Sequence, residues 1–310
     1  MSTGRHEFEL INWIRSQARP HDRLRLGIGD DTASLAFPDP ANCLVTVDML
    51  MEGVHFTIPP ATPRQIGRKA LGVNLSDIAA MAGRPLAAVI SLALPRGRPS
   101  GFVEELYAGI ADMAERFHVA IAGGDTNSWQ GPLVISITVL GEATGRGAVT
   151  RSGAQPGDHL FVTGDLGGSL AGKHLDFTPR INEALALHER VDLHAMIDLS
   201  DGLASDLAHI VAESRVGAIL DEAAIPVSEA ARAAAENDGR SAWEHALADG
   251  EDFELLFAVA PADGQRLLDD PPPGISLSRI GTVVEGGEIR LRHATGDVVP
   301  LAVSGYRHLL

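Results

Sequence analysis

The sequence predicts a protein of the α/β (α+β) class with two domains, one over residues 1–145 and one over residues 146–310. The chain has 310 residues, which is long for one ordinary domain and suits two. Apolar stretches of strand length and of helix length follow one another in mixed order through both parts. The stretch 141–147, rich in glycine and small residues, is typical of a linker between them.

The first domain is predicted to contain both helices and strands. Apolar residues with helical spacing predict helices over 7–15, 63–82 and 100–117. Ser100 is the expected N-cap of the last helix. Uninterrupted apolar runs predict strands over 43–47, 86–94, 119–122 and 133–142.

The second domain shows the same mixture. Strands are expected over 159–163, 196–197, 253–260 and 279–284, and a glycine-rich loop over 164–172. One helix is expected to start within the stretch 179–188, and a second helix is expected to cover 203–214. The alanine-rich stretch 230–235 predicts an exposed helix.

The composition of the chain excludes several classes of function. Hydrophobic residues make up 45% of the chain and charged residues 21%, so the chain can bury cores. A net charge of -16, from 25 basic and 41 acidic residues, argues against nucleic acid or an anionic membrane as partner. Residues 1–10 contain no apolar signal segment, and the longest apolar runs have strand length, so a cytoplasmic location is expected. The single cysteine, Cys43, is expected inside a buried strand and excludes an intramolecular disulfide framework.

The most informative feature is a set of aspartates at the ends of apolar runs. Ligands of α/β folds bind in the loops that follow strands. Carboxylates gathered there repel one another by roughly 4 kcal/mol per close pair at an effective dielectric constant near 20. Hard divalent cations such as Mg²⁺ relieve that repulsion, and a magnesium site suggests a phosphate-bearing substrate. The aspartates are Asp30, Asp31, Asp48, Asp77, Asp125, Asp198 and Asp201.

Several of these aspartates have a simpler interpretation when each is taken by itself. Gly29-Asp30 is a common β-turn pair, and Asp201 suits the N-cap of the helix from residue 203. Asp77 lies in an apolar helical stretch, so its carboxylate needs a partner there, either a metal or a buried Asn or Arg. Gly123-Gly124-Asp125 has the glycines that a phosphate-binding turn requires.

Other reaction classes find no support in the motifs. No Walker A loop and no Gly-x-Gly-x-x-Gly fingerprint follows a strand. Neither a nucleophile elbow nor a His-Glu-x-x-His helix occurs, which excludes the usual patterns of acyl transfer and zinc hydrolysis. A lone histidine such as His55 is more often structural than a ligand.

Taken together, the motifs resemble those of the thiamine-monophosphate kinase family. The resemblance spans nearly the whole chain in order, and its most specific parts are Val-His-Phe at 54–56 and Asn-Leu-Ser-Asp at 74–77. The matching segments are 27–33, 45–56, 67–85, 123–126, 151–158, 197–203 and 250–257.

The resemblance implies two α/β domains of the type found in aminoimidazole ribonucleotide synthetase. The N-terminal domain would have a mixed sheet, bind ATP and Mg²⁺, and form a homodimer through its sheet. Implied contacts with thiamine monophosphate are His55, Glu251 and Tyr306. Implied contacts with ATP are Tyr107, Gly124, Asp125, Arg151 and Ser200. Implied ligands of several Mg²⁺ ions are Asp30, Thr46, Val47 through its backbone carbonyl, Asp48, Asp77, Asp125, Asp198 and Asp201.

The implied reaction is direct in-line transfer of the ATP γ-phosphoryl group to the phosphate of thiamine monophosphate. The acceptor is already an anionic oxygen, so no catalytic base or covalent residue is expected. The chain departs from the family pattern at Val47, at Asp249 and in the short segment 172–179. Two alternatives stay open, namely another ATP-using member of the superfamily and a catalytically inactive nucleotide-binding scaffold.

Overall fold

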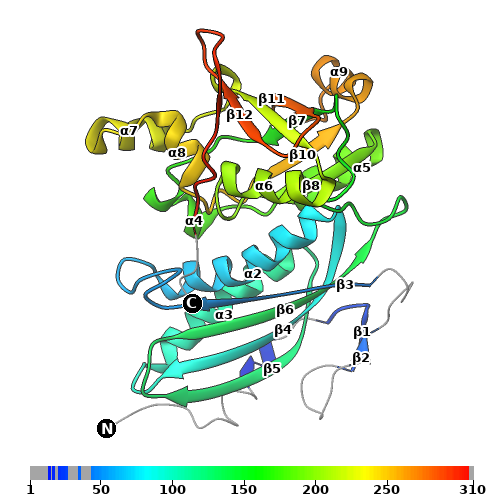
Figure 1. Cartoon of the computed structure of the whole chain (residues 1–310). Helices are drawn as coiled ribbons and strands as arrows, with labels where there is room; N and C mark the ends of the chain where they lie inside the picture. Colours follow the sequence, from blue (N-terminus) through cyan, green and yellow to red (C-terminus); the bar gives the residue numbers. More distant parts are fainter. Residues whose placement is uncertain (1–12, 15, 18–19, 27–33, 36–42, 307–310) are drawn as a thin grey trace. The chain divides into compact units, whose positions relative to one another are not determined.

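A computed structural model describes residues 13–14, 16–17, 20–26, 34–35 and 43–306. Asp30, Asp31 and most of the helix expected over 7–15 lie outside these residues. The chain divides into an N-terminal unit, Met1–Ile78 with Arg84–Ala143, and a C-terminal unit, Ala79–Gly83 with Thr144–Leu310 (Figure 1). The domain limits at residues 145 and 146 stay a prediction, whereas the mixed α/β class is confirmed.

The N-terminal unit is built on a mixed sheet. Its strand order is β3-β6-β4-β5, with β3–β6 antiparallel and β4–β5 parallel. A separate antiparallel pair joins β1 to β2. The strands are β1 (Leu24–Leu26), β2 (Ser34–Leu35), β3 (Cys43–Met51), β4 (Gly83–Pro95), β5 (Ala120–Trp129) and β6 (Val134–Ala143).

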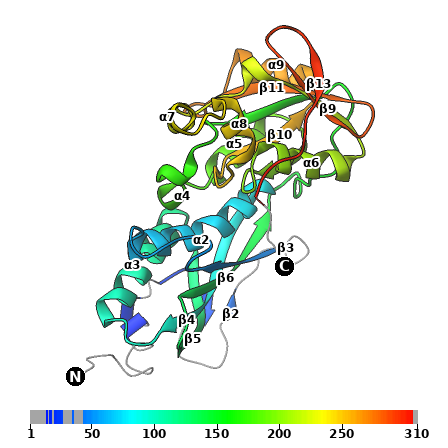
Figure 2. The ribbon, with the colours of Figure 1, turned by 60° about the vertical axis from the view of Figure 1, so that its left-hand side comes forward.

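Helices α2 (Pro63–Ala80) and α3 (Ser100–Arg116) lie together on one face of this sheet (Figures 1 and 2). Their backbones touch at two glycines. A Cβ atom on Gly67 would lie 2.0 Å from the carbonyl oxygen of Leu106, and one on Gly109 would lie 2.0 Å from that of Arg64. Glycine is therefore required at both positions for the helices to pack this closely.

The outward side chains of β3 correct the expected buried strand. Cys43 is exposed, and Val45, Val47 and Met49 are 63%, 60% and 57% exposed. The strand alternates between outward exposed residues and inward, more buried ones. Its apolar composition predicted burial on both faces, but α2 and α3 cover the inner face.

Three further expectations in this unit were wrong. Asp48 lies inside β3 and does not end it, because pairing with β6 continues to Met51. Residues 123–126 form part of β5 and not a turn, because pairing with β4 continues to Trp129. Pro99, not Ser100, is the N-cap of α3, and it makes no side-chain cap.

The C-terminal unit contains a larger sheet with the order β13-β12-β9-β11-β7-β10-β8. Its pairs are antiparallel except β12–β9, which is parallel. The strands are β7 (His159–Thr163), β8 (Leu193–Asp198), β9 (Gly217–Asp221), β10 (Leu255–Val259), β11 (Leu277–Val284), β12 (Ile289–Arg292) and β13 (Val298–Pro300).

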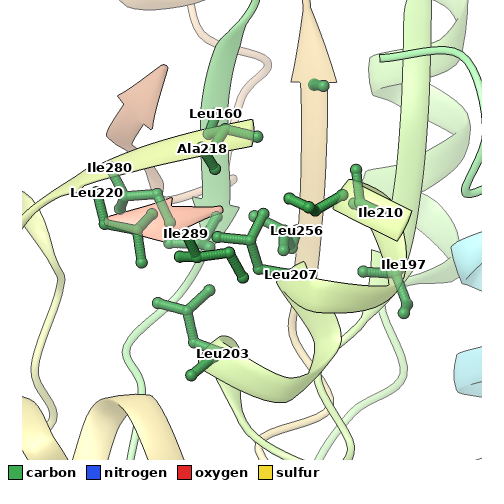
Figure 3. Packing of buried hydrophobic residues seen from close by; sticks show 14 of the residues in the cluster. Leu160, Ile197, Leu203, Leu207, Ile210, Ala218, Leu220, Leu256, Ile280 and Ile289 are labelled. Carbon is green, nitrogen blue, oxygen red and sulfur yellow. The ribbon is translucent and has the colours of Figure 1, made fainter. Parts of the chain in front are cut away.

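Helix α6 packs on one face of this sheet and supplies much of the core. Leu203, Leu207 and Ile210 of α6 cluster with sheet residues such as Leu160 and Leu256, all of them fully buried (Figure 3). On the other face, a Cβ atom on Gly264 of α9 would meet the His159 ring. The helical segments are η2 (Ser169–Ala171), α4 (Lys173–Asp176), α5 (Ile181–Arg190), α6 (Leu203–Ser214), η3 (Glu222–Ala224), α7 (Glu229–Asp238), α8 (Ala242–Ala248) and α9 (Pro261–Asp269).

None of the helices in the described ranges is long and apolar enough to cross a membrane.

Candidate functional site

The N-terminal unit brings Thr46, Asp48 and Asp77 together between β3 and α2. Thr46 Oγ1 donates to Asp77 Oδ2 at 2.5 Å. The backbone N–H of Asp48 donates to Asn74 Oδ1 at 3.1 Å, and Asn74 Nδ2 donates to the Ala70 carbonyl at 3.1 Å. Asn74 is fully buried, so it fixes β3 against the helix that carries Asp77. The sequence argument that Asp77 needs a polar partner agrees with this arrangement, but the hydrogen bond comes from the Thr46 hydroxyl, where a metal, Asn or Arg was expected.

Electrostatics shows why these oxygens suit a cation. Burial, and then the neighbouring Asp77 carboxylate, raise the pKa of Asp48 to about 7. Two carboxyl groups and a hydroxyl at one place form the hard oxygen donor set that Mg²⁺ prefers. The residues present therefore fit the metal that the sequence predicted.

His55 lies in the turn after β3, and its orientation is fixed by the backbone. Its Nδ1 accepts from the Met51 N–H at 3.0 Å, so the neutral ring carries its proton on Nε2. Lys69 Nζ donates to the His55 carbonyl at 2.7 Å, and Lys69 is 1% exposed. Lys69 was not singled out by the sequence, since a lysine in a helix is normally exposed.

Asp125 and Gly124 lie on β5. Asp125 is exposed, and its Oδ2 accepts from Asn127 Nδ2 at 3.0 Å. A Cβ atom on Gly124 would lie 1.8 Å from the Ile90 carbonyl oxygen. Close contact with β4 therefore explains this glycine without any ligand.

Tyr107 of α3 lines a cavity of about 140 Å³ in the same unit. Its hydroxyl is buried and has no hydrogen-bond partner among the residues that the structure describes. Burial also raises the pKa of the phenol. His21 and Glu115 lie on the same cavity wall, so the cavity offers polar groups to a ligand.

In the C-terminal unit, Asp198 ends β8 and a turn at Ser200–Gly202 leads into α6. Asp201 does not cap this helix, which corrects the sequence interpretation. The N-cap is Gly202, with φ 108° and no side-chain cap. Instead, Asp206 Oδ2 reaches back and accepts from the N–H groups of Asp201 and Gly202, both at 3.1 Å.

The sequence analysis missed Asp206 and His209. Asp206 is 2% exposed, and burial together with Asp198 and Asp201 raises its pKa to about 8. Ligand atoms of Asp201, Asp206 and His209 lie within 4.8 Å of one another. The signal was available, because Asp206 lies in an apolar helix just as Asp77 does.

The backbone brings four predicted site residues of this unit to one place. The Glu251 N–H donates to the Ser200 carbonyl at 2.7 Å, and the Tyr306 N–H donates to the Asp201 carbonyl at 3.0 Å. A Cβ atom on Gly305 would lie 2.5 Å from the Asp201 carbonyl oxygen. The turn at 200–202, the loop at 250–251 and the segment at 305–306 are therefore in direct contact.

The loop that carries Glu251 is strained and held on one side. Glu251 and Phe253 have φ values of 52° and 51°, which non-glycine residues seldom adopt. Asp252 is 1% exposed, and both its oxygens accept from the Gly167 N–H at 3.0 Å. Burial raises the pKa of Asp252 to about 7. Phe253 stacks on Phe177 with ring centroids 4.0 Å apart.

Glu254 completes this anchoring. It is 1% exposed and accepts from Arg180 at 2.7 and 2.8 Å, from Lys173 at 2.9 Å and from Thr163 at 2.7 Å. Asp249, where the family pattern has glycine, accepts from the Gly168 N–H at 3.0 Å. The segment 172–179 is thus packed against the loop through Lys173 and Phe177, and the Glu254 carboxylate of that loop is paired with Arg180 and Lys173.

Arg151 is not part of the group formed by Ser200, Asp201, Glu251 and Tyr306. It is exposed, and its carbonyl accepts from Ser214 Oγ at 3.0 Å, at the C-terminal end of α6. The turn at Ser200–Gly202 precedes the other end of the same helix, whose length is about 18 Å at 1.5 Å per residue.

Comparison with known proteins identifies the class and then the family. Residues 29–143 match the model of AIR synthase related protein, N-terminal domain, and residues 137–294 match that of its C-terminal domain. Fold and site residues thus define a two-domain AIR synthase related protein. A thiamine-monophosphate kinase from Rhodopirellula baltica is 40% identical over 309 residues, covering 97% of this chain and 97% of that protein. The chain belongs to the thiamine-monophosphate kinase family, which confirms the resemblance seen in the sequence.

Solved structures agree. Thiamine-monophosphate kinase from Stenotrophomonas maltophilia K279a has a TM-score of 0.77 and 36% identity, covering 92% of this chain and 96% of that chain. AaThiL complexed with AMPPCP and TMP has a TM-score of 0.76 and 30% identity, covering 99% of each chain.

Proposed function

We propose that this protein uses ATP to phosphorylate thiamine monophosphate, giving thiamine diphosphate by direct in-line transfer of the γ-phosphoryl group. The observation that carries the proposal is the 40% identity to a thiamine-monophosphate kinase over 97% of the chain. The AMPPCP and TMP bound in a 30% identical structure support the same pair of substrates.

The proposal assigns the carboxylates to several Mg²⁺ ions. When bound, Mg²⁺ supplies the positive charge that offsets repulsion between the two polyanionic substrates. Asp48 and Asp77 support this assignment, because their proximity is unfavourable without a cation. The proposed ligands are Asp30, which lies outside the described residues, Thr46, the Val47 carbonyl, Asp48, Asp77 and Asp125 in the N-terminal unit, and Asp198 and Asp201 in the C-terminal unit.

The remaining residues bind and orient the substrates in this proposal. Thiamine monophosphate combines a cationic thiazolium ring with a phosphate group. The Nε2–H of His55 is suited to donate to a phosphate oxygen, and the Glu251 carboxylate is suited to the thiazolium charge. Tyr306, which is 45% exposed, offers an aromatic surface. ATP would be held by Tyr107, Gly124, Asp125, Arg151 and Ser200.

The reaction needs no general base in this proposal. The attacking atom is a phosphate oxygen of thiamine monophosphate, which is already anionic at neutral pH. The protein therefore aligns the acceptor and the γ-phosphoryl group and keeps both charges balanced.

Incubating the full-length protein with ATP, Mg²⁺ and either thiamine or thiamine monophosphate tests the function. Chromatography should show thiamine diphosphate from thiamine monophosphate. Product from free thiamine would point to a pyrophosphokinase and contradict the proposal. ATP binding without product would favour an inactive scaffold, and ATP turnover on another acceptor would favour another superfamily member.

We also propose a homodimer that pairs through the exposed face of β3. Val45, Val47 and Met49 are apolar and more than half exposed, which is unfavourable in water. A second copy of this chain supplies a matching apolar strand. A cytoplasmic location, without nucleic acid or membrane partners, is consistent with ATP as co-substrate and with the net charge of -16.

A further inference from the structure

Asp206 occupies an unusual position for a carboxylate. It lies in the first turn of α6 and is 2% exposed, yet its Oδ2 faces backwards and accepts from the N–H groups of Asp201 and Gly202. Its own N–H donates to the Gly202 carbonyl at 2.9 Å. Gly202 and Asp206 are therefore joined in both directions, which fixes the turn relative to the helix.

The contact made by Asp206 differs from an ordinary N-cap. The first N–H groups of a helix have no partner within it, and a side chain at the N-cap usually accepts from them. Here the N-cap is Gly202, which has no side chain. Asp206 instead satisfies the two N–H groups that precede the helix, as the reciprocal glutamate of a capping box does.

The same turn is held on its other side by groups assigned to substrate binding. The carbonyls of Ser200 and Asp201 accept from the N–H groups of Glu251 and Tyr306. Asp206 thus holds the N–H groups of this turn, while Glu251 and Tyr306 hold its carbonyl groups. Without its oxygen, the part-buried N–H of Asp201 and the buried N–H of Gly202 would be unsatisfied and the turn would rearrange.

We propose that Asp206 is a positioning residue for the kinase reaction: by accepting from the Asp201 and Gly202 N–H groups, it sets the place of the Asp201 carboxylate and hence the affinity for divalent metal. This inference rests on the proposed function for the identity of the reaction. The structural link from Asp206 to Asp201 does not depend on it. In this proposal, the hydrogen-bond-accepting oxygen of Asp206 sets the metal affinity, and the negative charge of Asp206 does not.

The test compares Asp206→Ala with Asp206→Asn in the full-length protein. Alanine removes the acceptor, whereas asparagine keeps one oxygen that accepts hydrogen bonds. Mn²⁺ binding is followed directly by electron paramagnetic resonance. We expect Asp206→Ala to weaken it by about tenfold or more, the size found for groups that orient metal ligands. Asp206→Asn should bind Mn²⁺ much as the unmodified protein does.

Kinetics gives a second measurement. In Asp206→Ala, the Mg²⁺ concentration for half-maximal activity should rise, while kcat at saturating Mg²⁺ should recover toward that of the unmodified protein. A purely structural role would lower the melting temperature without this shift.

Asp158→Ala is the matched control. Asp158 is 3% exposed, and its Oδ2 accepts from the Gln155 N–H at 2.8 Å, in a turn that carries no predicted metal ligand. This variant should lose stability and keep its Mn²⁺ affinity.

Normal Mn²⁺ binding by Asp206→Ala would overturn the inference. So would an Asp206→Asn variant that binds as weakly as alanine, because the charge would then carry the effect. If Asp206→Ala does not fold, weak Mn²⁺ binding by Asp206→Asn still overturns the inference. Mn²⁺ binding as expected without thiamine diphosphate formation would refute the proposed function and leave the positioning role standing.

Discussion

At the scale of single residues, we expect replacement of Asp48 by asparagine to raise the stability of the metal-free protein and to lower its kinase activity. At pH 8 and without metal, its ionised carboxylate lies beside Asp77 in a largely buried place, where its pKa is raised to about 7. Asp48→Asn removes this repulsion and can donate to Asp77. We expect the melting temperature in EDTA to rise by about 2–4 °C for each kcal/mol of relieved repulsion.

The same substitution should lower kinase turnover by about a hundredfold or more, since a metal-binding oxygen and its charge are lost. Calorimetry in EDTA and the chromatographic kinase assay measure the two effects. Near-normal turnover in Asp48→Asn would remove Asp48 from the metal site.

Asp252 predicts a pH dependence of stability. Its pKa is about 7 in the folded protein and near 4 when unfolded, so the folded state binds more protons between these values. Stability is therefore lost as pH rises from about 4 to 7, by at most roughly 4 kcal/mol. Asp252→Asn keeps an acceptor for the Gly167 N–H without the charge.

Urea unfolding at pH 5 and pH 8 measures the effect. The unmodified protein should lose stability at the higher pH, and Asp252→Asn should lose less. An equal change in both proteins would show that Asp252 is not the group responsible.

Residue patterns revealed part of the site before the structure did. The apolar context of Asp77 correctly required a polar partner, and the structure supplies Thr46. The same argument applies to Asp206, but Asp201 had been taken as the cap of that helix. The hydrogen bonds from the Asp201 and Gly202 N–H groups to Asp206 depend on the local backbone of the turn, where Gly202 has a φ of 108°.

At the scale of elements, substitution of Gly124 tests whether the close packing of β5 on β4 requires glycine at this position. A Cβ atom there would lie 1.8 Å from the Ile90 carbonyl oxygen, so Gly124→Ala must separate β5 from β4. We expect a loss of about 1–3 kcal/mol in the free energy of unfolding. Its neighbour Gly123 has nothing within 4 Å of a Cβ position, so Gly123→Ala should leave stability nearly unchanged.

Urea unfolding of the two alanine variants gives the comparison. Equal stability of both would mean that the strands adjust freely and that close packing does not require Gly124.

Elements with clear local signals were predicted well. The strand at 159–163 and the helix at 203–214 have the predicted bounds, because an apolar run and an amphipathic period mark them. Strand β5 was predicted to stop at 122, since Gly123-Gly124 resembles a turn. Pairing with β4 carries it on to Trp129. Such extensions depend on a partner distant in sequence, as does β9, which was missed and lies between β11 and β12.

At the scale of the whole molecule, the shortened segment 172–179 leaves the C-terminal core intact. Leu175 and Phe177 are buried, and Phe177 stacks on Phe253. Arg180, just after the segment, pairs with the buried Glu254. The resemblance to the family implies that the segment is short, but the contacts that it makes with the loop at 249–254 join positions far apart in the chain.

The exposed face of β3 makes a prediction about assembly. If a second copy of this chain covers that face, Val45→Lys places a charge inside an apolar interface and should shift the protein from dimer to monomer. Val45 is 63% exposed and is not among the proposed ligand contacts, so the variant should fold. Leu268→Lys, at a 45% exposed leucine of α9, adds the same charge elsewhere and should stay dimeric.

Light scattering coupled to size-exclusion chromatography gives the masses of both variants. A dimer that survives Val45→Lys, or an unmodified protein that is already monomeric, would rule out this face as the interface.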